Sequence, residues 1–326
     1  MKKNFKDIKI FVAGHRGMVG TAFINYIKKK SFGKIITVNR NELNLENEEK
    51  VNKFIKNKKP DIIINCAGKV GGILANSTYP TEFLNENILI QMNIIKAAYK
   101  NNVKHLFNLG SSCIYPKNAK QPIKVEYLLS NKLEKTNEAY AIAKIVGLKM
   151  CDFYNQQYKT SYLTIMPCNL YGPNDNFDSK NSHFIPALIK KFTNSKNKKG
   201  NVEIWGTGRP KREVMHVDDL AGAIYFIIKK KISNNKNLLD YLKKTSVINV
   251  GSSKECTIKQ LANIIKKITN NNSKLIFNKK YPDGTMRKIL DNSSIKKLGW
   301  KPKIKLNEGL SQTISWYKKK YLKKLA

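Results

Sequence analysis

The string GHRGMVG, at residues 14–20, constrains the fold more than any other feature of the chain. It follows an apolar run at 8–14 and opens a helical pattern, and a second strand pattern comes at 34–40. A glycine turn in that context lets a pyrophosphate approach the backbone at a helix N-terminus, where free N–H groups favour an anion. The sequence therefore predicts a dinucleotide-binding turn that contains Gly14, Gly17 and Gly20.

Apolar runs of strand length alternate with helical patterns through the first half of the chain. Continuously apolar strands are typical of a parallel sheet that is covered by helices on both faces. We therefore predict an α/β fold, a Rossmann-type doubly wound parallel sheet with a smaller C-terminal α/β substrate domain. The expected strands lie at 8–14, 34–40, 61–68, 105–112 and 161–172, and the expected helices near 18–30, 46–57, 81–101 and 137–158.

The pattern loosens after residue 172 into shorter elements and loops rich in Pro, Gly and Asn. We expect an NADP-binding Rossmann domain at 1–172 that also takes in segments near 214–230 and 246–256, because 247–253 again looks like a buried strand. Residues 173–326 are then mainly a discontinuous substrate domain. The string HVDD at 216–219 predicts a helix start with Asp218 as its cap.

The charge of the chain is strongly positive, with 61 Lys and Arg against 23 Asp and Glu and a formal net charge of +38. Clustered basic residues would indicate nucleic acid or an anionic surface. The basic residues are nearly all Lys, however, and they are scattered along the chain together with Asn. We therefore expect no nucleic acid partner, and we expect the field to favour anionic ligands.

The five cysteines are odd in number and show no Cys-x-x-Cys spacing. That usage argues for a reducing compartment and against a disulfide framework or a metal site. No apolar run reaches membrane-spanning length, and the charged N-terminus has no signal-peptide core. We expect a cytoplasmic protein with no membrane association.

The end of the second predicted strand distinguishes between the two nicotinamide cofactors. An NAD site usually has Asp or Glu there for the ribose 2′-hydroxyl, whereas this chain has Asn39 followed by Arg40. Arg16, inside the glycine turn, points to the same region. Two guanidinium groups without an acid suit a 2′-phosphate, so we predict NADP(H).

Tyr140 and Lys144 are four residues apart and share one face of a predicted helix. A phenol with a pKa of about 10 is a poor proton relay at neutral pH, but a neighbouring ammonium stabilises the phenolate. Ser111 lies at the C-terminal end of the fourth strand, at the sheet edge where ligands bind, and its hydroxyl can hold the same carbonyl oxygen that Tyr140 protonates.

These motifs together resemble the extended short-chain dehydrogenase/reductases that act on nucleotide sugars. The resemblance rests on the glycine turn, Ser111, the Tyr140 to Lys144 spacing and NLYGP at 169–173. The strings KVGGI, GSSCIYP, WGTGRPKREVMHVDD and PDGTMRK extend it from about residue 8 to about residue 316. They are similar to members that take a GDP-4-keto-6-deoxy sugar through 3,5-epimerisation and then reduce the C4 ketone.

The resemblance implies roles for individual residues. Cys113 and His183 would be the base and acid that invert C3 and C5, after which NADPH reduces C4 with Tyr140 as proton donor. A homodimer through the helices at 81–101 and 137–158 is also implied. Further cofactor-binding residues would be Met18, Val19, Lys144, Pro167, Asn169 and Leu170, and substrate-binding residues Lys191, Trp205, Arg212 and Asp283. Cys168 stands where members commonly have Thr, and Lys191 lies where they commonly have Arg nearby.

Two alternatives remain open from the sequence. The first is another nucleotide-sugar enzyme of the same superfamily: a 4-epimerase has no need of Cys113 or His183, and a 4,6-dehydratase would have an acidic pair after the serine, which SSCIY does not contain. A basic nucleic-acid-binding protein on an inactive reductase fold would explain the charge. Intact Ser111, Tyr140 and Lys144 argue against that last alternative.

Overall fold

A computed structural model describes residues 5–178, 181–194, 200–281 and 283–322. Its larger part is a six-stranded sheet in the order β2-β1-β3-β4-β5-β9, with every neighbouring pair parallel. This arrangement confirms the predicted α/β class with a Rossmann-type sheet. The strands are β1 Lys9–Ala13, β2 Lys34–Ile36, β3 Ile62–Asn65, β4 His105–Leu109, β5 Tyr162–Pro167 and β9 Val247–Val250.

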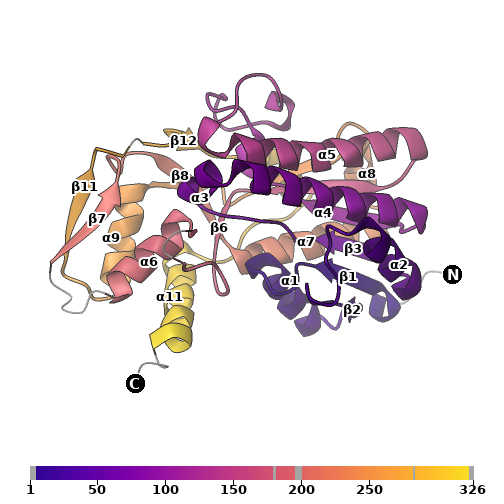
Figure 1. Ribbon diagram of the computed structural model, residues 1–326, viewed down its shortest axis with the longest axis horizontal. Helices are drawn as coiled ribbons and strands as arrows, with labels where there is room; N and C mark the ends of the chain where they lie inside the picture. Colours follow the sequence, from indigo (N-terminus) through magenta and orange to yellow (C-terminus); the bar gives the residue numbers. More distant parts are fainter. Residues whose placement is uncertain (1–4, 179–180, 195–199, 282, 323–326) are drawn as a thin grey trace.

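Helices cover both faces of this sheet (Figure 1). Alternate side chains of β1 enter two different cores, Ile10 and Val12 on one side and Phe11 on the other. That burial on both faces explains why the strand runs are continuously apolar. The covering helices are α1 Met18–Lys29, α2 Glu48–Lys58, α4 Pro80–Lys100, α5 Glu138–Tyr158 and α7 Val217–Ile232, with the short α3 Ile73–Thr78, α8 Lys236–Leu242 and α10 Ser293–Lys297 beside them.

A smaller part is built around two further sheets and a third apolar core. β7 Asn201–Trp205 and β11 Lys274–Asn278 form a two-stranded parallel sheet. The other sheet holds β6 Asn169–Tyr171, β8 Lys211–His216, β10 Glu255–Thr257 and β12 Arg287–Lys288. Helices α6 Phe184–Asn194, α9 Ile258–Ile268 and α11 Leu306–Tyr317 complete this part.

Three local expectations were wrong. The run 161–172 is two strands rather than one, because the chain leaves the large sheet at Cys168 and β6 pairs with β8. The strand expected at 34–40 ends at Ile36. Asp218 is not the cap of α7: the cap is His216, whose Nδ1 accepts a hydrogen bond from the Asp218 amide at 3.3 Å.

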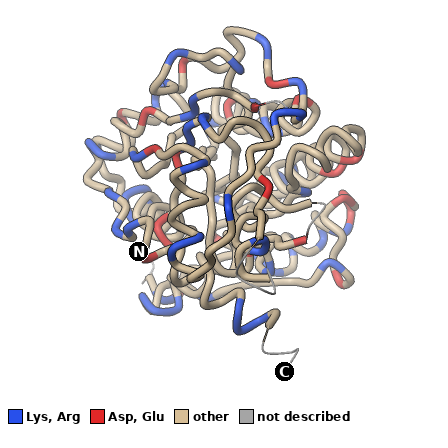
Figure 2. The backbone as a smooth tube through the Cα atoms, turned by 90° about the vertical axis from the view of Figure 1, so that its left-hand side faces the viewer, with Lys and Arg blue, Asp and Glu red and all other residues tan. Residues whose placement is uncertain are grey.

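Two segments from the second half of the chain pack with the first. α7 lies against α1, and β9 extends the large sheet beyond β5. Both segments overlap the ranges expected to return to the first part, and the division at residue 172 remains a prediction. Among the described residues no helix is both long and apolar enough to cross a bilayer. In the view of Figure 2, Lys and Arg are spread around the whole outline of the molecule.

Candidate active site

The glycine turn has the geometry of a phosphate cradle. Gly14 has φ +76°, and a Cβ there would lie 2.7 Å from the amide nitrogen of Ala67, so no other residue fits without moving β3. Gly17 caps α1 without a side-chain hydrogen bond, which leaves the first N–H groups of the helix for a ligand. The turn therefore fits the pyrophosphate of a dinucleotide.

A pocket of about 370 Å³ opens beside this turn, at the carboxyl ends of the central strands. It brings together ten of the residues expected from the sequence. Nine others from that set do not line it: Gly14, Arg16, Gly20, Arg40, Cys113, Lys191, Trp205, Arg212 and Asp283. The ten lining residues are Gly17, Met18, Val19, Ser111, Tyr140, Lys144, Pro167, Asn169, Leu170 and His183.

Ser111 joins the two chemical functions of the site. It follows Gly110 at the end of β4, and its side chain acts to lower the pKa of both the Tyr140 phenol and the Cys113 thiol. Its Oγ also accepts from the Cys113 amide at 3.5 Å, within the turn that places the thiol. A ketone oxygen held at Ser111 and Tyr140 would therefore have Cys113 as a neighbour.

Burial sets the protonation of Tyr140 and Lys144. The Lys144 Nζ donates to the Leu109 carbonyl at 3.0 Å and lies 5.8 Å from the centroid of the Tyr140 ring. Desolvation lowers the pKa of Lys144 to about 8 and raises the pKa of Tyr140. The shift of Tyr140 is opposite to the one expected from Lys144 alone, because a buried phenolate loses hydration. The phenol is thus held as a proton donor.

Cys113 is buried in the short helical turn after Ser111. Burial raises the pKa of its thiol, while Lys288, Ser111 and Lys144 act to lower that pKa. The thiol therefore needs more help to act as a base than its ordinary pKa would suggest. Lys288 was not identified from the sequence: it reaches this region because β12 pairs with β8, and no local spacing indicates such a pairing.

Two titratable groups lie at the mouth of the pocket, His183 and Asp175. Desolvation by the surrounding protein lowers the pKa of His183, although its side chain remains accessible to solvent. Burial raises the pKa of Asp175 to about 7. Its Oδ2 is buried without a hydrogen-bond partner among the described residues. Asp175 was also missed from the sequence, where it reads as a loop residue.

Arg16 and Arg40, the basic residues expected near the adenosine of the cofactor, lie in exposed positions. Arg40 pairs with Glu46 at 3.0 Å and approaches Glu86 at 3.8 Å, and its side chain is 73% exposed. Glu86 also pairs with Lys69 at 2.5 Å. A 2′-phosphate at Arg40 and Arg16 fits these positions, with Glu46 as a competitor for the guanidinium.

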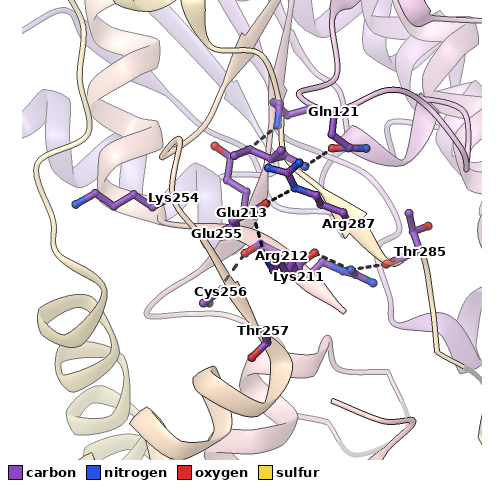
Figure 3. A network of polar contacts seen from close by, with 12 residues as sticks. Gln121, Lys211, Arg212, Glu213, Lys254, Glu255, Cys256, Thr257, Thr285 and Arg287 are labelled. Carbon is purple, nitrogen blue, oxygen red and sulfur yellow. Dashed lines mark hydrogen bonds and ion pairs between the residues drawn. The ribbon is translucent and has the colours of Figure 1, made fainter. Parts of the chain in front are cut away.

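The four expected substrate residues lie in the smaller part of the molecule, on α6, on β7, on β8 and in the segment after β11. The Asp283 carboxylate accepts from the Thr207 amide at 2.9 Å and the Thr207 hydroxyl at 2.6 Å, and its charge acts on Arg212. Arg212 donates to the Thr285 carbonyl at 2.5 Å (Figure 3) and is the register partner of Lys288. Lys191 donates from Nζ to the carbonyl of Glu203 at 2.7 Å, two residues before Trp205.

The parallel sheet, the glycine cradle, the half-buried Ser111 and the buried Tyr140 and Lys144 define a dinucleotide-dependent enzyme that acts on a carbonyl group. The chain belongs to the NAD dependent epimerase/dehydratase family, whose model matches residues 10–251. It is an enzyme of the epimerase/reductase type that GDP-L-fucose synthases represent.

The chain is similar over nearly its whole length to characterised relatives. GDP-L-fucose synthase 1 of Arabidopsis thaliana is 47% identical, over 96% of this chain and 94% of that protein. The GDP-L-fucose synthase of Escherichia coli K12 is 44% identical, over 95% and 96%. GDP-L-colitose synthase of Yersinia pseudotuberculosis is 39% identical, over 95% and 98%.

Solved structures give the same picture. A GDP-6-OMe-4-keto-L-xylo-heptose reductase from C. jejuni superposes with a TM-score of 0.88 at 37% identity, covering 96% of this chain and 98% of that one. A GDP-mannoheptose C4 reductase from Campylobacter jejuni, solved with NADP bound, gives a TM-score of 0.85 at 36% identity, covering 97% and 100%. The family and these structures support a nucleotide-sugar epimerase/reductase that uses NAD(P).

Proposed function

We propose that the protein is a GDP-L-fucose synthase, which converts GDP-4-keto-6-deoxy-D-mannose to GDP-L-fucose with NADPH in the cytoplasm. The observation that carries the proposal is the position of Ser111, whose side chain acts on both the phenol of Tyr140 and the thiol of Cys113 and has its Oγ bonded to the Cys113 amide. One carbonyl site with a proton donor and a neighbouring thiol is what epimerisation followed by reduction requires. The relatives at 44–47% identity carry this name.

Inversion depends on the acidity of the protons at C3 and C5, which both flank the C4 ketone. Cys113 as thiolate removes the proton, Ser111 and Tyr140 stabilise the enolate oxygen by hydrogen bonding, and His183 as imidazolium returns a proton to the opposite face. Because burial raises the pKa of Cys113 and lowers that of His183, one proton must pass from thiol to imidazole before inversion. The same transfer, relayed by solvent, resets the pair for the second carbon.

Reduction follows at the same oxygen. Bound NADPH supplies the hydride to C4. Tyr140 gives its proton to the oxygen, Ser111 keeps its hydrogen bond to that oxygen, and the ammonium of Lys144 stabilises the phenolate left behind. A proton from solvent restores Tyr140. The proposed cofactor contacts are those of the glycine turn, Arg16, Arg40 and the pocket residues already named.

A homodimer is part of this proposal. α4 and α5 pack side by side (Figure 1). Both helices carry exposed aromatic or aliphatic side chains that a monomer leaves in water. Phe153 is 58% exposed and Ile142 42%, both on α5. Light scattering should give twice the chain mass, and Phe153→Glu should shift the protein to the monomer, whereas Phe5→Glu, at the other end of the chain, should not.

A second candidate is a GDP-sugar C4 reductase without epimerase activity. The raised pKa of Cys113 and its absence from the pocket lining favour it, as do the similar heptose reductases. In such an enzyme NADPH would be consumed without inversion of the sugar.

The deciding experiment supplies GDP-4-keto-6-deoxy-D-mannose and NADPH to the purified protein, follows absorbance at the nicotinamide band and identifies the product sugar by NMR. We expect GDP-L-fucose from wild type, almost no reduction from Tyr140→Phe, and loss of inversion from Cys113→Ser. Cys256→Ser, which changes a thiol outside the pocket, is the control. Reduction of C4 without inversion by wild type would select the second candidate. Failure to oxidise NADPH with any GDP-4-keto sugar would refute both.

A further inference from the structure

The outer face of the β7–β11 sheet exposes an unusual amount of apolar surface. On β7, Val202 and Ile204 turn into the third core, so Glu203 and Trp205 face outward. Trp205 is 49% exposed, and Tyr281, just beyond β11, is 42% exposed. Large exposed aromatic groups that adjoin a charged site indicate a surface for a ligand.

Trp205 and Tyr281 lie parallel, with ring centroids 4.2 Å apart and planes at 13°. The strands hold this pair in place, because Trp205 is the register partner of Asn278, whose carbonyl accepts from the Tyr281 amide at 3.4 Å. At that separation no third ring fits between them. A flat heterocycle can therefore stack only on the outside of the pair, where each ring leaves surface in water.

The polar groups at the edge of this pair include a hydrogen-bond acceptor and a hydrogen-bond donor. The Glu203 Oε1 accepts from the Trp205 indole Nε1 at 3.2 Å, so the carboxylate lies beside the rings and keeps its other oxygen for a further donor. The ammonium of Lys191 lies next to it, where Nζ donates to the Glu203 carbonyl. The stacked pair of Trp205 and Tyr281, which we call the platform, thus has a hydrogen-bond acceptor and a donor side by side at its edge.

The charged site for a diphosphate adjoins the platform. Thr207 comes two residues after Trp205 and holds the Asp283 carboxylate, which in turn acts on the Arg212 guanidinium. A nucleoside diphosphate with its phosphates at Arg212 would extend its base toward Trp205 and Tyr281.

We propose that Glu203 and Tyr281 determine the base specificity of the enzyme, by selecting guanine. The base stacks on the Trp205–Tyr281 pair, Glu203 accepts hydrogen bonds from the ring N1–H and the 2-amino group, and Lys191 donates to O6. Guanine is the base whose edge offers two adjacent donors beside a carbonyl oxygen, and a carboxylate beside an ammonium matches that pattern. The inference rests on the proposed GDP-sugar substrate and adds two residues to its site.

Calorimetric titration of the full-length protein with GDP, IDP, ADP and UDP tests the inference. IDP lacks the 2-amino group, so wild type should bind it about tenfold more weakly than GDP, which corresponds to about 1.4 kcal/mol. In Glu203→Gln the amide oxygen can still accept from the Trp205 indole. The amide NH2 group, which is a donor, then takes the place of the carboxylate oxygen that faces the base. This variant should weaken GDP binding and bring the ratio of the IDP and GDP dissociation constants close to one.

The stacking residue has a different signature. Tyr281→Ala should weaken all four nucleotides by a similar factor of roughly tenfold, because stacking tolerates any base, and Tyr281→Phe should bind as wild type does. Glu82→Gln, on the exposed first turn of α4, is the matched control for a lost carboxylate.

The outcomes separate the inference from the proposed function. Should wild type prefer UDP or ADP, or bind none of the four, the GDP-sugar function itself is wrong. Should wild type prefer GDP while Glu203→Gln keeps the wild-type IDP to GDP ratio, the function stands and Glu203 does not read the base. Unchanged affinities in Tyr281→Ala would remove the stacking role in the same way.

Discussion

Removal of Glu213 should weaken the sheet of β6, β8, β10 and β12 more than removal of any other group. Glu213 lies on β8 with no exposed surface, and its carboxylate accepts from the amides of Ser253 at 2.6 Å and Leu290 at 2.8 Å and from the Asn292 side chain at 2.9 Å. These donors come from two separate segments of the chain. The Glu213 carboxylate therefore holds the loop after β9 and the segment after β12 against β8.

The expected size of the effect follows from those three bonds. Each buried donor left without an acceptor costs about 1–3 kcal/mol. Burial also raises the pKa of Glu213, so part of the loss is offset when a desolvated carboxylate is removed. We expect Glu213→Ala to lower the free energy of unfolding by about 3–5 kcal/mol. In Glu213→Gln an amide replaces one oxygen, which breaks some of these bonds, and the loss should be roughly half as large.

Urea unfolding followed by far-UV circular dichroism measures this difference. The control is Glu255→Ala on the neighbouring strand β10, where Glu255 is the register partner of Glu213 and pairs with Arg287 at 2.8 Å. That pair is partly exposed to solvent, so its loss should shift the midpoint much less than the loss of Glu213. If Glu213→Ala and Glu255→Ala unfold at the same urea concentration, the buried carboxylate does not fasten the sheet, and the accounting of its three bonds is wrong.

Further changes should affect the cofactor and the pH profile. Arg40→Ala should raise KM for NADPH at least about tenfold with little change for NADH, and Glu46→Gln, which frees the guanidinium, should lower KM for NADPH; steady-state kinetics with both cofactors check this. The reduction rate should fall as pH rises through about 8, because burial lowers the pKa of Lys144 to about 8 and the ammonium that stabilises the phenolate is lost above it; a flat kcat/KM profile from pH 7 to 9 would contradict this. Burial raises the pKa of Asp175 to about 7, so Asp175→Asn should remove a dependence of KM for the GDP-sugar on pH between about 6 and 8, a comparison that needs only the two profiles.

Local patterns were enough for the large sheet and for the centre of the pocket. The strand before Gly14, the turn itself and the helix after it are consecutive in the chain, so their arrangement follows from residues within a short window. Tyr140 and Lys144 are one helical turn apart, and the helix that carries them begins one residue from its expected start. Ser111 follows from the rule that ligands bind at the carboxyl ends of parallel strands.

The features that the sequence did not reveal depend on the pairing of strands that are far apart in the chain. The run 161–172 is mostly buried, so nothing in it signals the change of sheet at Cys168. Lys288 comes near Cys113 only because β12 returns to β8 from far along the chain. The pKa of Tyr140 was expected to fall and instead rises, and the raised pKa of Cys113 was not foreseen, since desolvation comes from segments that no local spacing brings into view.

The chain passes between the two parts of the molecule more than once, and this limits where it can be divided into fragments. The chain leaves the large sheet after β5, returns through α7 to pack on α1, and later supplies β9 as the edge strand of that sheet. A fragment that ends at residue 172 would present the bare edge of β5 and the uncovered apolar face of α1 to water. Split reporters, domain swaps and truncations at that apparent boundary should therefore yield aggregating halves, whereas an insertion in the loop at 233–235 interrupts neither sheet.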